Sequence, residues 1–247
     1  MSVKAESLLF GGNIKLNGLL GEIVQPKLKD FIEHDIAIND FISPFYLIVS
    51  AYVENGGIDK PLLSLIAINI QLSRDGRDTI LDNFLVSLAM LYKGFKLEML
   101  EFEDSIVIAI KESDEIKYLI DDDNFIDLCE AVMDMFKIKV EKEDADLDLL
   151  DAPPEIIEKI KKGRKEFRAK QREKKNNLEF FDMCNELIHI NNEYNYDKVL
   201  NMTIWQIKNS YSILTVKNAQ DNYVNSGSVQ WKAEDFPDWR KETKIKK

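Results

Sequence analysis

Cysteine and histidine are scarce in this sequence, with two of each among 247 residues. Cys129 and Cys184 lie inside the apolar helical patterns IDLCEAVMDMF and FFDMCNELI, and neither has a second thiol at CxxC spacing. A disulfide framework or a thiolate metal site needs paired cysteines. Both cysteines are therefore predicted to be reduced residues of the core, because free cysteine is among the most frequently buried residue types.

Sequence signatures of catalysis are absent too. None of the motifs GxSxG, HExxH, GxxxxGKS/T and GxGxxG occurs, which removes the usual reasons to predict a hydrolase, a zinc protease or a nucleotide-binding enzyme. His34 and His189 have no Ser or Cys nucleophile motif beside them and are predicted to be partly exposed helix residues. We expect a protein that is not an enzyme, with no catalytic, cofactor-binding or metal-binding residue.

Long apolar runs are missing as well. No stretch approaches the roughly 20 apolar residues that a membrane-spanning helix needs. The first residues, MSVKAESLLFGGN, lack the apolar run of a signal peptide, so a cytoplasmic protein without a membrane partner is expected. The formal net charge of −11 makes the molecule as a whole repel phosphate backbones and anionic membranes, and nucleic acid is not an expected partner.

Charge is abundant and segregated. Residues 141–154, EKEDADLDLLDAPP, are acidic and end in two prolines, so we expect a linker there. Asp144, Asp146 and Asp148 have the 1-3-5 spacing of a calcium-binding loop, but the sixth position of such a loop needs glycine and here holds Leu149. A solvated linker is therefore favoured over a calcium site.

A basic run follows this acidic stretch directly. Between residues 155 and 176, ten Lys or Arg residues accompany four Glu residues. Phe167 is the single aromatic residue of the run, whereas binding to single-stranded nucleic acid needs aromatic side chains on which bases stack. A solvated helix, or a surface for an acidic protein partner, is favoured over nucleic-acid binding.

Helical and strand patterns alternate without the βαβ rhythm of a parallel sheet, so we expect a helix-rich α+β fold. SLLF and IKLNGLL are predicted as two short strands joined by a hairpin turn at residues 11–13, Gly-Gly-Asn. A short helix is expected after Pro26. A second helix is predicted to follow Pro44, to be buried on most of its surface and to end at Gly56.

The periodicity of the remaining segments predicts further helices, a β-hairpin and a helical C-terminal region. The N-terminal α+β domain, residues 1–140, should hold helices at 61–72, 78–92 and 122–135 and a hairpin at 95–110 that turns around 103–105. Asp121, Asp122 and Asp123 are interpreted as negative charge at the N-terminus of the last of these helices. After the linker, residues 155–247 should form a helical region with a polar tail and helices at about 178–190, 193–200 and 203–224.

The start of the last predicted helix carries the sharpest local signal, in the stretch LNMTIWQIKNS. Thr203 and Gln206 are spaced as a capping box, in which each side chain bonds the backbone N–H of the other residue. Met202 and Ile207 occupy the two positions of a hydrophobic staple. An apolar stripe with Trp205 beside it is predicted along this helix; its members are Ile204, Ile207, Tyr211 and Leu214.

Two regions of the chain resemble the tail assembly chaperones of long-tailed bacteriophages and prophages. The first is LLFGGNIKLNGLLGEIVQPKLKDF, with ISPFYLIVS after it. The second is VLNMTIWQIKNSYSIL, followed after a short gap by NSGSVQWKAEDFPDW. The central part of the chain matches that family only in its alternation of elements.

The resemblance implies a late phage protein, made in the cytoplasm of the infected bacterium, that binds the tape measure protein, keeps it soluble and helps tail tube subunits polymerise around it. Trp205, Tyr211, Trp231 and Trp239 are the candidates for partner contact, although a place in the core is favoured for Trp205. The alternative is a structural tail or baseplate component, and a regulatory module that binds nucleic acid ranks third. Self-association is left open.

Overall fold

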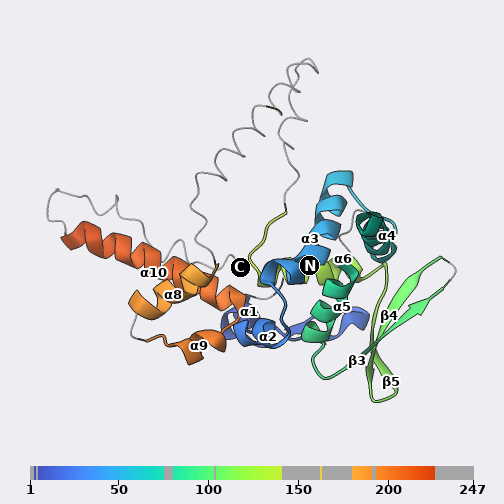
Figure 1. The fold of residues 1–247 in the computed structure, drawn as a ribbon, viewed down its shortest axis with the longest axis horizontal. Coiled ribbons are helices and arrows are strands. Elements are labelled where there is room, and N and C mark those ends of the chain that lie inside the picture. Colours follow the sequence, from blue (N-terminus) through green and yellow to red (C-terminus); the bar gives the residue numbers. More distant parts are fainter. Residues whose placement is uncertain are drawn as a thin grey trace.

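The computed structural model describes residue 3 and residues 5–74, 80–102, 104–140, 162, 180–190 and 193–225. It confirms a helix-rich α+β fold with antiparallel sheets (Figure 1). A small three-stranded sheet lies at one end of the molecule and the C-terminal helices lie at the other, with the remaining helices between them.

The N-terminal region opens with a helix where the sequence analysis expects a strand. Its elements are α1 (Ala5–Phe10), β1 (Ile14–Lys15), the 3-10 helix η1 (Gly18–Leu20) and β2 (Glu22–Ile23). A hairpin is present, but it pairs Ile14 with Ile23 and does not form across residues 11–13. The strand prediction for SLLF is wrong because so short an apolar run fits a helix as well as a strand. Gly11, at a φ of 65°, follows the last residue of the helix.

Helices α2 (Leu28–Glu33) and α3 (Ile38–Asn55) follow. The prediction that α3 begins after Pro44 is wrong, since this proline lies inside the helix. Proline lacks the N–H that would bond the carbonyl of Asp40, and the Ser43 hydroxyl donates to that carbonyl instead, at 3.1 Å. A side chain thus replaces the backbone bond that the proline removes.

The C-terminus of α3 matches its prediction, whereas its burial does not. Gly56 adopts the left-handed conformation, with φ 71°, and its N–H donates to the carbonyl of Tyr52. Phe45 and Ile48 are fully buried, but Tyr46 and Tyr52 are exposed. The helix therefore buries one face rather than most of its surface.

Helices α4 (Pro61–Arg74), α5 (Ile80–Leu91) and α6 (Phe125–Met135) confirm the helical predictions for these regions. Two of the aspartates before α6 cap different helices. Asp121 accepts a bond from the N–H of Asn124 at 3.1 Å, as expected for a residue at a helix start. Asp122 instead accepts the N–H of Leu62 at 2.8 Å, so it caps the start of α4 across a gap of 60 residues.

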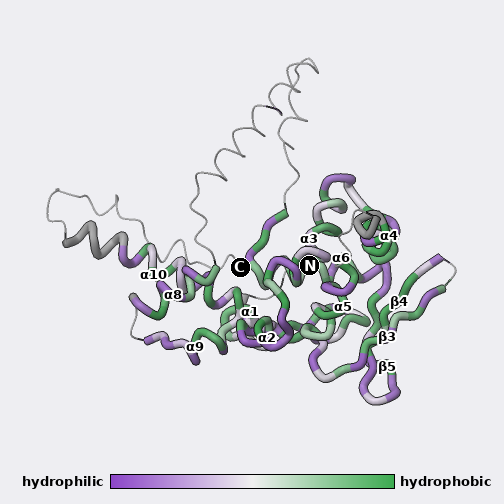
Figure 2. The backbone as a smooth tube through the Cα atoms, in the orientation of Figure 1, coloured by the Kyte–Doolittle hydropathy of each residue, from purple (hydrophilic) through white to green (hydrophobic). Residues whose placement is uncertain are grey.

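The three-stranded sheet contains β3 (Lys96–Glu101), β4 (Ile106–Glu112) and β5 (Glu115–Ile120), with β4 in the middle. The predicted hairpin is confirmed, since β3 and β4 pair antiparallel from Lys96 with Lys111 to Glu101 with Ile106. Strand β5 was not predicted; of its residues EIKYLI only Ile120 is buried, so burial does not alternate along this strand. Figure 2 shows hydrophilic residues at both turns of this sheet and hydrophobic residues along the middle of β4.

The C-terminal helices α8 (Phe180–Ile190), α9 (Tyr196–Leu200) and α10 (Ile204–Asn225) are present as predicted. Their buried residues Leu187 and Ile207 belong to the same hydrophobic core as Phe31 and Phe136 of the N-terminal region. The predicted linker at 141–154 lies outside the described residues, but the described segments on either side of it share one core. No helix among the described residues is long and apolar enough to cross a membrane.

Aromatic rings hold the centre of this core together. Phe41 of α3 contacts Phe31 of α2 in an edge-to-face arrangement, with ring centroids 5.2 Å apart, and lies 5.4 Å from Phe136. Phe84 of α5 bridges Phe45 and Phe125 at 5.7 and 5.5 Å. Such pairs contribute roughly 0.5–1.5 kcal/mol each beyond the burial of their surface. They fix α2 and α3 in the positions from which these helices line the candidate site.

Candidate functional site

The capping box at the start of α10 is present and extends beyond the helix. Thr203 Oγ1 accepts the N–H of Gln206 at 3.2 Å, and Gln206 Oε1 accepts the N–H of Thr203 at 2.9 Å. The amide nitrogen of the same Gln206 side chain donates to the carbonyl of Leu9 at 2.9 Å. One side chain therefore caps α10 and ties it to the C-terminal end of α1, 197 residues away in the sequence.

The backbone joins the same two regions a second time. Lys27 and Thr203 form an antiparallel β-bridge, and the N–H of Leu28 donates to the carbonyl of Met202 at 3.0 Å. These residues belong to the sequence regions QPKLKDF and VLNMTIWQIKNS. The two regions thus form one structural unit, which we call the junction and define by Leu9, Lys27, Thr203 and Gln206.

A second glutamine holds the turn after α1. Gln25 is buried, and its side-chain amide donates to the carbonyls of Ser7 at 2.7 Å and Gly12 at 2.5 Å. At Gly11, where φ is 65°, a Cβ atom would lie 3.1 Å from the side-chain nitrogen of Gln206. The positive φ favours glycine at this position, and a Cβ atom there would fit only if the Gln206 side chain shifted. The GGN residues therefore form the turn after α1, and the glutamine of QP stabilises that turn, so neither feature marks a hairpin turn.

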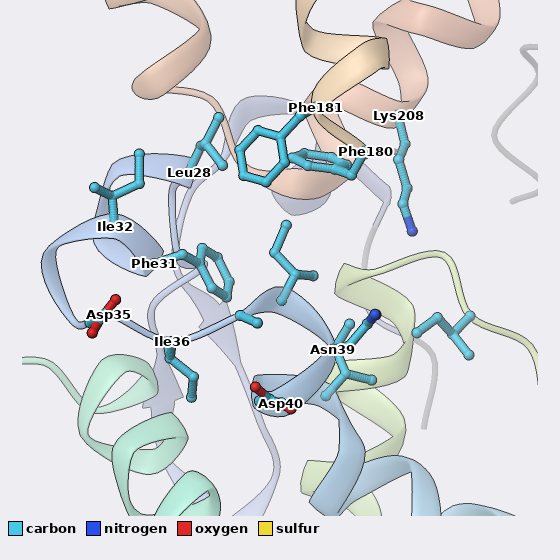
Figure 3. Close-up of a pocket in the computed structure, with 14 residues that line it drawn as sticks. Leu28, Phe31, Ile32, Asp35, Ile36, Asn39, Asp40, Phe180, Phe181 and Lys208 are labelled. Carbon is cyan, nitrogen blue, oxygen red and sulfur yellow. The ribbon is translucent and has the colours of Figure 1, made fainter. Parts of the chain in front are cut away.

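Next to the junction lies an apolar groove of about 830 Å³ (Figure 3). One wall is a ridge of α2 formed by Leu28, Phe31 and Ile32, which are spaced i, i+3, i+4. The opposite wall is the start of α8, with Phe180 and Phe181. The first turns of α3 form the floor between these walls, and Ile138 and Lys208 also line the groove.

The walls of the groove rise from a buried base to an exposed rim. Phe31 and Ile42 are buried, because they also belong to the core. Ile32 is 61% exposed and Phe181 is 59% exposed. Single exposed apolar side chains are ordinary on protein surfaces, but exposed aromatic and aliphatic side chains that face one another across a concave surface are typical of a binding site.

Charge is distributed unevenly around the groove. Figure 3 shows Lys208 on the side opposite Asp35 and Asp40. The ammonium group of Lys208 donates to the carbonyl of Phe136 at 3.0 Å, and burial, together with the nearby charge of Lys137, lowers the pKa of Lys208 below its usual value. Among the described residues Lys208 forms no ion pair. The groove therefore has a cationic side and an anionic side.

The four predicted contact residues differ in their placement. Trp205 is only 5% exposed, and the ammonium of Lys137 lies 4.7 Å from the centroid of its ring. It is a core residue and offers no contact surface in this structure. Tyr211 is half-buried, and its hydroxyl donates to Glu186 at 2.9 Å. Trp231 and Trp239 lie outside the described residues.

Cysteine and histidine show no catalytic arrangement in the described part of the chain. Cys129 and Cys184 are buried free thiols, as predicted; burial raises the pKa of Cys129 well above its usual value and that of Cys184 to about 11. His34 and His189 are exposed. No cluster of His, Cys, Asp or Glu suited to a metal ion is found among the described residues. The acidic run at 141–154 lies outside the described residues, as does the basic run at 155–176 apart from residue 162.

Sequence reasoning did not find the groove. The sequence signals for it were the adjacent Phe180 and Phe181 and the apolar spacing of Leu28, Phe31 and Ile32, but neither signal is distinctive alone. Comparison with protein-family models, curated proteins and solved structures finds no match for this chain.

Proposed function

We propose that this chain is a non-enzymatic tail assembly chaperone of a long-tailed bacteriophage or prophage, which acts in the cytoplasm of the infected bacterium. It binds the tape measure protein, keeps it soluble and promotes the assembly of tail tube protein around it. The observation that carries the proposal is the junction, because the two regions with the family resemblance contact each other directly through Gln206 and Leu9.

The groove supplies the binding surface that the proposal needs. A tape measure protein is long and helical, so its unassembled segments expose apolar helix faces. A groove with apolar walls and charged surroundings receives such a face by the helix-in-groove mode. Ile32 and Phe181 provide apolar rim contacts, and the net charge of −11 favours solubility of the complex.

Co-expression tests the proposal. The chain is produced together with the tape measure protein encoded beside it, and soluble complex is measured by gel filtration. We expect the client to become soluble and to co-elute with the chain, and to do so much less with the variant Phe181→Asp. Ile116→Asp, an equally simple change at an exposed position on β5 away from the groove, is the matched control. A client that stays insoluble with the unaltered chain contradicts the proposal.

A virion measurement separates the chaperone from its alternative, a structural tail or baseplate component. Mass spectrometry of purified particles should detect the tail tube and tape measure proteins without this chain. Stoichiometric amounts of the chain in mature particles would favour the structural role instead.

A further inference from the structure

Lys208 occupies an unusual position in the groove. Its side chain extends from α10 beside Phe180 (Figure 3), and the one hydrogen bond that its ammonium group makes to a described residue goes to the carbonyl of Phe136. An ammonium group has three donors, so the remaining ones are available to another acceptor. Partial burial of a cation without a counter-ion is unfavourable, and no described acidic side chain offsets it.

The apolar part of the groove specifies a shape. Leu28, Phe31 and Ile32 are spaced i, i+3, i+4 on α2. Leu28 and Phe31 are buried in the core and Ile32 is exposed, so Ile32 is the residue of this row that another helix can pack against. Phe181 faces this ridge from the start of α8. A helix with its own apolar stripe at the same spacing fits between the two walls.

We infer that the groove binds one amphipathic helix of a partner protein, with the apolar stripe of that helix against Ile32 and Phe181 and a flanking carboxylate paired with Lys208. The inference rests on the proposed function for the identity of the partner, the tape measure protein. Charge complementarity argues for the placement, because Lys208, which forms no ion pair with the residues that the structure describes, lies on one side of the groove and Asp35 and Asp40 lie on the other. A basic residue of the bound helix therefore faces these two aspartates.

Designed peptides test the pairing on the full chain. One labelled peptide of about five helical turns carries leucines at i, i+3, i+4 and i+7 and a single glutamate beside them; its twin carries glutamine in place of the glutamate. Fluorescence anisotropy should show the glutamate peptide binding the unaltered chain roughly tenfold more tightly, as expected for a partly desolvated ion pair. The preference should weaken as salt concentration rises.

Substitution of Lys208 completes a double-mutant cycle with the two peptides. Lys208→Met removes the charge and keeps an apolar stem, so both peptides should then bind equally. Lys217→Met, at an exposed position further along the same helix, should keep the tenfold preference. Urea unfolding checks that each variant is folded; if Lys208→Met is not, the preference of the unaltered chain and its salt dependence decide the question. No binding, or a preference that Lys208→Met leaves unchanged, overturns the inference.

A different occupant of the groove would give different results in these experiments. If the unaltered chain dimerises and Phe181→Asp splits the dimer, a second copy fills the groove and the inference is overturned. The proposed function fails separately, since co-expression without a soluble complex contradicts the chaperone role even when the designed peptide binds. Conversely, if the Phe181→Asp variant forms as much soluble complex with the tape measure protein as the unaltered chain, the chaperone role is supported but the groove is not its binding site.

Discussion

The junction predicts a measurable loss of stability when Gln206 is truncated. In Gln206→Ala, the Thr203 N–H loses its side-chain acceptor at 2.9 Å and the carbonyl of Leu9 loses its donor at 2.9 Å. Each hydrogen bond of this kind contributes about 1 kcal/mol net. Because Gln206 is only half-buried, water replaces part of what is lost, and we expect the free energy of unfolding to fall by about 2 kcal/mol rather than more.

Gln206→Glu separates the two bonds. A glutamate still accepts the N–H of Thr203, as in a common capping box, but at neutral pH it has no proton to donate to Leu9. Its destabilisation should be about 1 kcal/mol at pH 7 and should shrink near pH 4, where the carboxyl group begins to protonate and becomes a donor. Alanine at this position should show no such recovery relative to the unaltered chain.

Urea unfolding followed by far-ultraviolet circular dichroism measures these differences, at constant m-value. In thermal unfolding, a loss of 1 kcal/mol lowers the Tm of a chain of this size by about 2–4 °C. If Gln206→Ala unfolds within about 0.3 kcal/mol of the unaltered chain, the hydrogen bonds of the junction contribute nothing net and the reasoning is refuted.

Two further substitutions test the packing and the electrostatics of the fold. Gly21→Ala should lower the free energy of unfolding by about 3 kcal/mol or more, because the glycine has a φ of 65° and a Cβ there would overlap the ring of Tyr118. Gly12→Ala is the control, since a Cβ at that position meets open space. Equal unfolding midpoints for the two variants would contradict the packing of Gly21 against Tyr118. Asp30→Asn should destabilise the chain above about pH 4 and progressively less below it. Burial alone would raise the pKa of Asp30, but hydrogen bonds from Lys27 and Lys93 lower it, so the stability that the ionised carboxylate contributes is lost as pH falls through its folded pKa. A difference between Asp30→Asn and the unaltered chain that stays constant from pH 6 to pH 3 would refute this assignment, as measured by urea unfolding at each pH.

Local signals in the sequence predicted local structure well. The capping box of Thr203 and Gln206 was recognisable because its partners are three residues apart and its geometry depends on the helix alone. The end of α3 at Gly56 and the β3–β4 hairpin followed from glycine conformation and period-two alternation in the same way. In each case the interaction that decides the structure lies within one element or one turn.

Predictions failed where distant residues decide the structure. SLLF forms a helix whose final turn is held by Gln25 and Gln206, and no pattern within four residues could reveal these partners. Pro44 by itself indicates a helix boundary, but the Ser43 hydroxyl replaces the missing donor and Pro44 is buried. Tertiary contacts override local preference in both cases.

The groove was beyond prediction for the same reason, and this ties it to the junction. Its walls come from α2 and α8, and its cation comes from α10, so no single segment of the sequence contains it. The bridge between Lys27 and Thr203 fixes the start of α2 against the start of α10, which sets where Lys208 lies relative to Phe31. Loosening the junction should therefore misalign the charged and apolar parts of the groove before it unfolds the chain, because the two parts belong to different elements that only the junction and the shared core hold in register. It follows that Gln206→Ala should weaken the tenfold glutamate preference of the designed peptides while the protein remains folded. A preference that stays intact in folded Gln206→Ala would mean that the core alone positions Lys208.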